Sequence, residues 1–209
     1  MDILRQLRNE YRNVMFLSKQ RKRLLNKDIC LIASNCNGAM ILHDLGLQFK
    51  SPFVNLWLRP HDFIKLLSSL EEYMKYDLRF TTEEGIDYPI GLLKDVKIYF
   101  QHYRTEQDAK TKWNERVKRM NYNNLFVLFT DRDGCTEQDL LEFDKLPYKK
   151  KVVFVNRPHS SIKSAVYIRG FEDEECVGPC MAYKSKISYR RYYDDFDYVE
   201  WFNSVLQEE

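Results

Sequence analysis

The chain has 209 residues, 44% hydrophobic and 31% charged, which is enough apolar material for one sizeable core. Its 33 basic and 31 acidic residues give a net charge of only +2, so no overall field favours DNA or RNA as a partner. Only 7 glycines are present. Neither G-x-G-x-x-G nor G-x-x-x-x-G-K-[ST] occurs, which argues against nucleotide binding by those two loops.

The five cysteines are an odd number in a chain that carries no signal peptide and no apolar window of about 18 residues. We therefore expect reduced thiols and a cytoplasmic protein. Cys176 and Cys180 have neither a second cysteine pair nor a histidine cluster beside them, so their spacing argues against a zinc site.

Residues 1–27 form a basic segment with the pattern of an amphipathic helix. They hold eight basic and two acidic residues, a net charge of +6 that leaves −4 for the remainder. One predicted face consists of Leu4, Leu7, Tyr11, Val14 and Ser18. Two interpretations are open: the helix packs on the domain or on a second subunit, or it makes a peripheral contact with anionic lipid.

From residue 28 onward, short apolar runs alternate with helical patterns. Strands are predicted at 29–33, 53–58, 125–129, 151–155 and 164–168, with two more within 88–100. Helices are predicted at 39–45, 61–76, 105–120, 136–146 and 195–205.

Strands separated by helices predict a single α/β domain over residues 28–209. We expect a mostly parallel sheet flanked by helices in a Rossmann-like arrangement, preceded by the N-terminal amphipathic helix. The alternative is an α+β fold, because residues 88–100 and 151–168 can each form an antiparallel pair.

The loop that follows the first predicted strand concentrates small polar groups around one thiol, and its residues are Ser34, Asn35, Cys36, Asn37 and Gly38. Ligands of parallel sheets bind where strands end and helices begin. The helix N-terminus there favours an anion and is expected to lower the pKa of Cys36. The alternative is that Ser34, Asn35 and Asn37 only cap the helix.

A second candidate loop, Asp131-Arg132-Asp133, follows the strand at 125–129. Two carboxylates one residue apart can face the same way and share a divalent cation that holds a diphosphate. The alternative is an ordinary Asp-Gly turn with a helix cap. His102 follows a predicted strand and can reach the same sheet edge as Cys36, where it would serve as a base.

The chain resembles an uncharacterised bacterial family of exopolysaccharide or capsule biosynthesis proteins, the domain of unknown function 1919. The resemblance extends from about Cys30 to Phe202, and the stretches that carry it are Ser34-Asn35-Cys36 with Gly38, His43-Asp44-Leu45-Gly46-Leu47, Ser51-Pro52-Phe53-Val54-Asn55-Leu56, Tyr88-Pro89-Ile90-Gly91, His102-Tyr103, Lys112-Trp113-Asn114-Glu115-Arg116, Asn121-Tyr122-Asn123-Asn124-Leu125-Phe126, Thr130-Asp131-Arg132-Asp133 and Phe196-Asp197-Tyr198. The resemblance implies a pathway, surface-polysaccharide biosynthesis, more than a reaction.

The preferred hypothesis is a cytoplasmic transferase that moves an acyl or similar group to a sugar intermediate. In it, Cys36 is the nucleophile or an oriented polar ligand and His102 the base. Ser34, Asn35, Asn37 and Gly38 would bind substrate, as would Asp131, Arg132 and Asp133, and no resident metal or cofactor is assigned.

Two alternatives accompany this hypothesis, and in both the substrate side remains a sugar or sugar nucleotide. One is a metal-dependent glycosyltransferase that uses Asp131 and Asp133. The other is a non-catalytic assembly factor whose N-terminal helix docks on a membrane enzyme.

Overall fold

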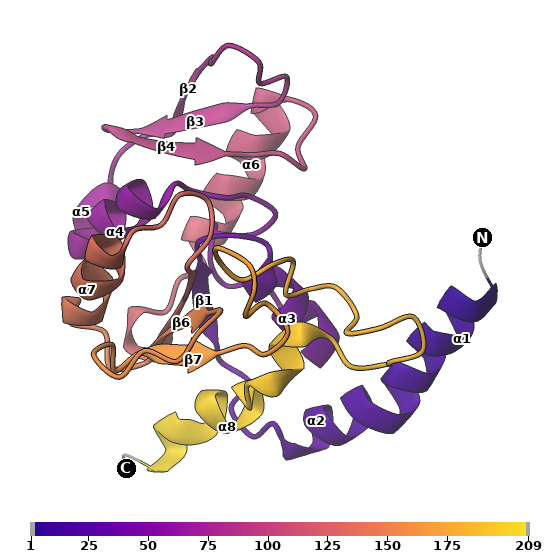
Figure 1. The fold of residues 1–209 in the computed structure, drawn as a ribbon. Coiled ribbons are helices and arrows are strands. Elements are labelled where there is room, and N and C mark those ends of the chain that lie inside the picture. Colours follow the sequence, from indigo (N-terminus) through magenta and orange to yellow (C-terminus); the bar gives the residue numbers. More distant parts are fainter. Residues whose placement is uncertain (1–2, 208–209) are drawn as a thin grey trace.

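The structure is a computed structural model that describes residues 3–207, and a parallel sheet of four strands lies at its centre (Figure 1). These strands are β1 (Cys30–Ala33), β5 (Leu125–Thr130), β6 (Lys151–Val155) and β7 (Ala165–Tyr167). They lie side by side in the order β1-β5-β6-β7, with every neighbouring pair parallel. The fold is therefore of mixed α/β type, as the alternation of strands and helices predicted.

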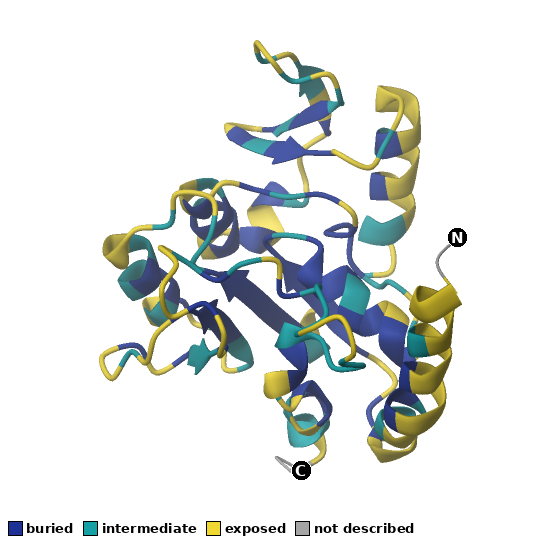
Figure 2. Ribbon diagram, turned by 45° about the vertical axis from the view of Figure 1, so that its right-hand side comes forward, coloured by how far each residue is buried: buried dark blue, intermediate teal, exposed yellow. Residues whose placement is uncertain are grey.

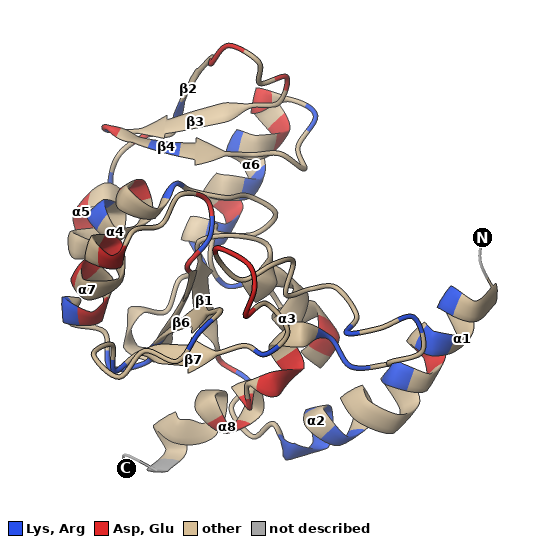
Figure 3. Cartoon of the chain, viewed as in Figure 1, with Lys and Arg blue, Asp and Glu red and all other residues tan. Residues whose placement is uncertain are grey.

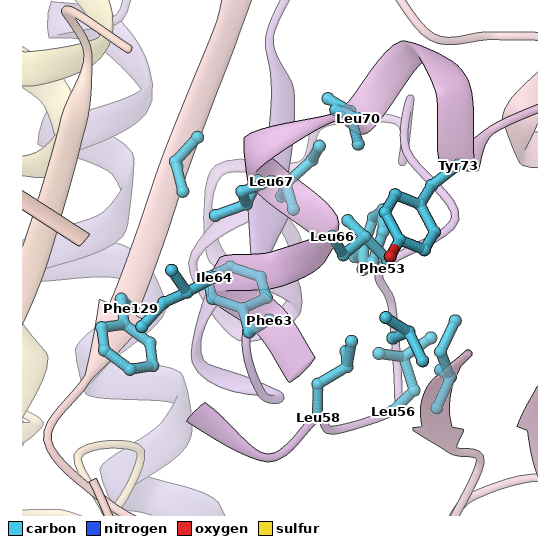
Figure 4. Packing of buried hydrophobic residues seen from close by; sticks show 14 of the residues in the cluster. Phe53, Leu56, Leu58, Phe63, Ile64, Leu66, Leu67, Leu70, Tyr73 and Phe129 are labelled. Atoms are coloured by element: carbon cyan, nitrogen blue, oxygen red, sulfur yellow. The ribbon is translucent and has the colours of Figure 1, made fainter. Parts of the chain in front are cut away.

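Both faces of this sheet are covered, because successive side chains of each strand enter different cores. Val127 and Phe129 join one core, which includes residues of α4 (Pro60–Ser68), α5 (Leu70–Tyr73), α6 (Glu106–Val117) and α7 (Glu137–Lys145). Phe126 and Leu128 join the other, with α3 (Asn37–Leu45) and α8 (Tyr198–Asn203). Figure 2 shows the buried strands between exposed outer helix faces, and Figure 4 shows the packing around α4.

A second, antiparallel sheet is formed by β2 (Arg79–Thr81), β3 (Ile90–Leu93) and β4 (Val96–Tyr99). It lies beyond the α4 and α5 end of the main sheet (Figure 1). The antiparallel alternative was thus right for residues 88–100 and wrong for 151–168, where β6 and β7 are parallel. The strand β2 was not predicted.

The strand predicted at 53–58 is wrong, although most of this segment is buried. Asn55 adopts a left-handed conformation with φ 59°, which interrupts extended structure. Trp57 exchanges two backbone hydrogen bonds with Tyr99, and the Leu58 N–H donates to the Ser34 carbonyl. The segment therefore connects the two sheets, and its burial reflects that position between them.

Local backbone and capping contacts explain which of the predicted helix boundaries are right and which are wrong. The single helix predicted at 61–76 is broken at Ser69, whose φ of −144° and ψ of 43° separate α4 from α5. Thr105 is the N-cap of α6 and accepts from the Asp108 N–H, while Thr136 and Asp139 form a capping box at α7. These caps explain why both helices begin within one residue of the predicted positions. The chain closes with η3 (Tyr192–Asp195), α8 and η4 (Ser204–Gln207).

The N-terminal helix is present as α1 (Ile3–Tyr11), η1 (Arg12–Leu17) and α2 (Ser18–Arg23), but the predicted apolar face does not pack on the domain. Leu4, Leu7, Tyr11 and Val14 are exposed, and the buried residues are Arg12, Phe16 and Leu17. Two features explain the difference. The η1 stretch is a π-helix, which changes the phase of the helical face, and the buried ion pairs of Arg12 set the rotation of the helix. None of the described helices is long and apolar enough to cross a membrane.

Candidate functional site

A pocket of about 360 Å³ lies at the carboxyl end of the main sheet, beside the ends of β1 and β5. Its lining includes most of the residues that the sequence singled out: Asn35, Cys36, Asn37, His102, Arg132 and Asp133. Trp57, Gln101 and the stretch 179–181 complete the wall. A larger pocket, of about 690 Å³, includes Leu125 and Lys150 and so lies at the opposite end of the strands. We place the candidate site at the carboxyl end, where parallel sheets bind ligands.

Cys36 is the N-cap residue of α3 and is 9% exposed. The Nε2 of Gln101 donates to its sulfur at 3.6 Å. Burial raises the pKa of the Cys36 thiol because the thiolate loses hydration, and the Gln101 hydrogen bond only partly opposes this. The expectation of a lowered pKa for Cys36 is therefore wrong, since desolvation outweighs the hydrogen bond from Gln101.

His102 is exposed and lines the same pocket as Cys36, next to Gln101. The Nε2 atoms of Gln101 and His102 lie 3.4 Å apart. The side chain of Gln101 thus lies between the thiol and the imidazole and contacts both. Cys36 and His102 come together as expected, with an amide between them that the sequence interpretation missed.

Asn35 and Asn37 have different roles at the start of α3. Asn35 donates to the Thr130 hydroxyl at 2.8 Å and accepts from the Asn37 N–H at 3.2 Å, so its amide joins the ends of β1 and β5. Asn37 is 4% exposed, and its Oδ1 is a buried acceptor with no hydrogen-bond partner among the described residues. An unmet buried acceptor costs about 1–3 kcal/mol, and a ligand that donates there would remove that cost.

Ser34 and Gly38 act through their backbones and do not line the pocket. The Ser34 N–H donates to the Leu128 carbonyl, which extends the pairing of β1 with β5. A Cβ on Gly38 would lie 2.6 Å from the Cβ of Ala33, so glycine allows α3 to pack closely on β1. We therefore assign both residues to positioning the loop, and their predicted role in binding substrate stays a prediction.

The loop after β5 does not bring its two carboxylates to one place. Asp131 accepts from the backbone N–H groups of Asn156 at 2.9 Å and Val177 at 2.7 Å, and it does not line the pocket. Burial raises its pKa, although these N–H groups favour the charged form. Asp133 has φ 61°, which breaks the expected alternation, and lines the pocket beside Arg132.

Arg132 supplies positive charge to the pocket and forms no ion pair within residues 3–207. In that described range, no group of three or more His, Cys, Asp or Glu side chains is placed to hold a metal ion. The pocket therefore offers an unpaired guanidinium, a buried thiol and an unsatisfied amide, a set suited to a polar, partly anionic molecule.

Sequence reasoning missed three parts of the pocket: Trp57, Gln101 and the stretch 179–181. The Trp57 ring stacks on Tyr99 with centroids 4.0 Å apart and an interplanar angle of 10°, so it is held rigidly at the wall. For Trp57, the available signal was its position near the end of a predicted strand. For Gln101, the available signal was its position next to His102. The stretch 179–181 reaches the pocket from the C-terminal third of the chain, and its Cys180 was considered only as a zinc ligand.

Comparison with known proteins gives a family but no activity. The family model described as "Domain of unknown function (DUF1919)" matches residues 7–203. An "Uncharacterized protein" of Haemophilus influenzae (strain ATCC 51907 / DSM 11121 / KW20 / Rd) is 47% identical over 183 residues, which cover 88% of each chain. The pocket, the strands and nearly all helices lie within the matched range. The chain therefore belongs to the DUF1919 domain family.

Proposed function

We propose that the protein is a cytoplasmic transferase of surface-polysaccharide biosynthesis that moves an acyl or similar group onto a sugar intermediate. The observation that carries the proposal is the convergence of Cys36, Gln101 and His102 on one pocket at the carboxyl end of the sheet. The link to polysaccharides rests on the family resemblance of the sequence. A Rossmann-like classification of the main sheet belongs to the same proposal and rests on its parallel strands and the place of its pocket.

The proposed reaction has two halves, with an activated acyl ester or thioester as donor. Substrate binding turns the exposed His102 ring from Gln101 toward Cys36. The Cys36 thiol then gives its proton to His102, and the sulfur attacks the acyl carbonyl. A sulfur–carbon bond forms, the bond to the leaving group breaks, and His102 returns the proton to that group. A sugar hydroxyl then gives its proton to His102, and its oxygen forms the ester bond. The sulfur–carbon bond breaks, and His102 returns the proton to the Cys36 thiolate.

The neighbours of Cys36 fit these steps. The Gln101 amide donates to the sulfur and stabilises the thiolate once it forms. Arg132 stabilises negative charge on the substrate, and Trp57 offers an aromatic wall against which the apolar face of a sugar ring can pack. Because burial keeps the resting thiol neutral, the thiolate forms only as its proton moves to His102 during the attack.

The test is replacement of Cys36 in the intact chain. In a strain that lacks the gene, Cys36→Ala is expected to abolish polymer production, whereas the wild-type chain restores it. The matched control is Cys30→Ala, which removes another buried thiol from the opposite end of β1. Both variants are first checked by circular dichroism and thermal unfolding.

A covalent readout separates catalysis from assembly. After incubation with activated acyl esters or thioesters, mass spectrometry should find the acyl group on the Cys36 peptide of the wild-type protein. Normal polymer from Cys36→Ala would overturn the proposal. If Cys36, His102, Asp131 and Asp133 all tolerated alanine, the assembly-factor alternative would replace it.

A further inference from the structure

One face of the N-terminal helix is apolar and exposed. Ile3 is 74% exposed, Leu7 56% and Val14 63%. Beside this helix lies the segment 184–191, in which Ile187 is 95% exposed. Arg8 donates to the Lys186 carbonyl at 3.2 Å and Tyr11 packs against Tyr189, so the contacts on both sides of Ile187 connect this segment to α1. We call Ile3, Leu7, Val14 and Ile187 the apolar stripe.

A groove of about 640 Å³ separates α1 from the segment 181–191. Its lining contains no carboxylate and four cations: Arg5, Arg8, Lys186 and Arg191. The guanidinium groups of Arg8 and Arg191 lie 3.8 and 5.0 Å from the ring centroid of Tyr183. The groove therefore holds like charges close together. Figure 3 shows basic residues both on α1 and on the loop that runs beside it. We call it the basic groove.

The cations of the basic groove are incompletely paired. The Nε atoms of Arg8 and Arg191 are buried donors with no acceptor among the described residues. Arg5 and Lys186 form no ion pair in residues 3–207. Buried donors and clustered cations are costly without a counter-charge, and an anion in the groove would supply both an acceptor and that charge.

The stripe and the groove adjoin each other. Arg8 follows Leu7 by one residue, which places the two side chains about 100° apart around the helix. The helix projects from the body of the molecule at its N-terminal end, as Figure 1 shows. A flat surface that carries anionic groups above an apolar layer can therefore contact both features together.

Charge distinguishes between the occupants that could cover this surface. A second copy would bring one segment with a net charge of +6 against another, which is unfavourable. A small soluble anion would fill the groove and leave the stripe exposed. We propose that α1 and the segment 184–191 form a peripheral docking surface for an anionic phospholipid membrane. Headgroup phosphates enter the basic groove, and the apolar stripe enters the boundary between headgroups and acyl chains.

The test is vesicle co-sedimentation of the full chain with mixed phosphatidylglycerol–phosphatidylcholine vesicles and with pure phosphatidylcholine vesicles. Binding is expected only to the anionic vesicles and is expected to weaken with added salt. Arg5→Gln with Lys186→Gln should weaken it about 25-fold, about fivefold for each charge. Leu7→Ser with Ile187→Ser should weaken it about 100-fold, about tenfold for each side chain.

Matched controls come from exposed residues elsewhere in the chain. Lys118→Gln removes an exposed cation directly after α6, and Leu206→Ser removes a half-exposed leucine of η4. Both should bind vesicles as the wild type does. The tested residues are exposed or lie at a groove rim, so their variants are expected to fold, and thermal unfolding verifies this.

Four outcomes would overturn the proposal. They are absence of vesicle binding, equal binding to both kinds of vesicle, binding unchanged in the stripe and groove variants, or dimerisation that the Leu7→Ser and Ile187→Ser changes abolish. Stabilisation by inorganic phosphate without vesicle binding would make the groove a site for a soluble anion, which also contradicts the proposal. None of these readouts depends on the transferase activity proposed above.

Discussion

The two ends of α3 hold polar clusters of opposite character. Near its C-terminal end, Asp44 joins a buried network in which Arg12 also binds Asp194, and the hydroxyl of Tyr193 donates to Asp44 at 2.6 Å. At its N-terminal end, Asn37 has a buried acceptor without a partner among the described residues. Cys36 has only long contacts, accepting from Gln101 at 3.6 Å and donating to the Leu56 carbonyl at 4.0 Å.

The difference between these clusters separates structural from functional polarity. Burial opposes the charge on Arg12, but hydrogen bonds and charge from Asp194 outweigh it and raise the guanidinium pKa. Polar groups that satisfy one another in this way connect the N-terminal helix to α3 and to the C-terminal region. Groups left unsatisfied inside a pocket are available to a ligand. The same helix thus anchors an arm of the protein at one end and forms a candidate site at the other.

The largest expected effect comes from breaking the satisfied cluster. Arg12→Met leaves the carboxylates of Asp44 and Asp194 without their guanidinium partner and should lower the free energy of unfolding by about 3–5 kcal/mol. The matched control is Arg23→Met, which breaks the exposed Arg23–Asp197 pair and should cost less than about 1 kcal/mol. Urea denaturation measures both. Equal losses would show that the buried network does not anchor the helix.

A smaller effect of opposite sign is expected at the unsatisfied end. Asn37→Ala removes a buried acceptor that has no partner, so the free energy of unfolding should be unchanged or rise by up to about 1 kcal/mol. Polymer production should nevertheless fall, because substrate loses a contact. Asn35→Ala is the comparison, since Asn35 is hydrogen-bonded to Thr130 and to the Asn37 N–H, and it should be destabilising. A loss of stability in Asn37→Ala would mean that the amide has a structural role.

The smallest effect is a shift in thiol reactivity. Because burial raises the pKa of Cys36, its alkylation by iodoacetamide should keep accelerating with pH beyond the range in which an ordinary thiol levels off. Gln101→Ala removes a donor to the sulfur and should move the profile to still higher pH. Mass spectrometry of the Cys36 peptide across a pH series measures both profiles. A profile at lower pH than that of a free thiol would show that the helix N-terminus controls this cysteine.

The same raised pKa has a consequence for stability. The folded state favours the neutral thiol, so this contribution is fully present below the unfolded pKa of cysteine. It is lost as the pH rises through the higher folded pKa. Cys36→Ala should therefore reduce the alkaline sensitivity of unfolding, in addition to its effect on function.

Local sequence was sufficient for the parts of the fold that local physics controls. The apolar runs at 29–33, 125–129 and 151–155 became parallel strands, and Thr105 and Thr136 begin helices, because burial pattern and side-chain capping act over a few residues. His102 follows β4 of the antiparallel sheet, so it meets Cys36 through the Trp57–Tyr99 connection and not through the parallel-strand rule from which the meeting was predicted.

Contacts between distant segments decided the rest. The rotation of the N-terminal helix depends on Arg12 meeting Asp194, 182 residues away. The Asp131 carboxylate meets backbone donors of Asn156 and Val177, so it holds loops together instead of facing the pocket with Asp133. The pKa of Cys36 follows from how much protein surrounds it. Sequence periodicity identifies which residues can form a face, whereas the free energy of satisfying buried charges and donors decides which face is buried.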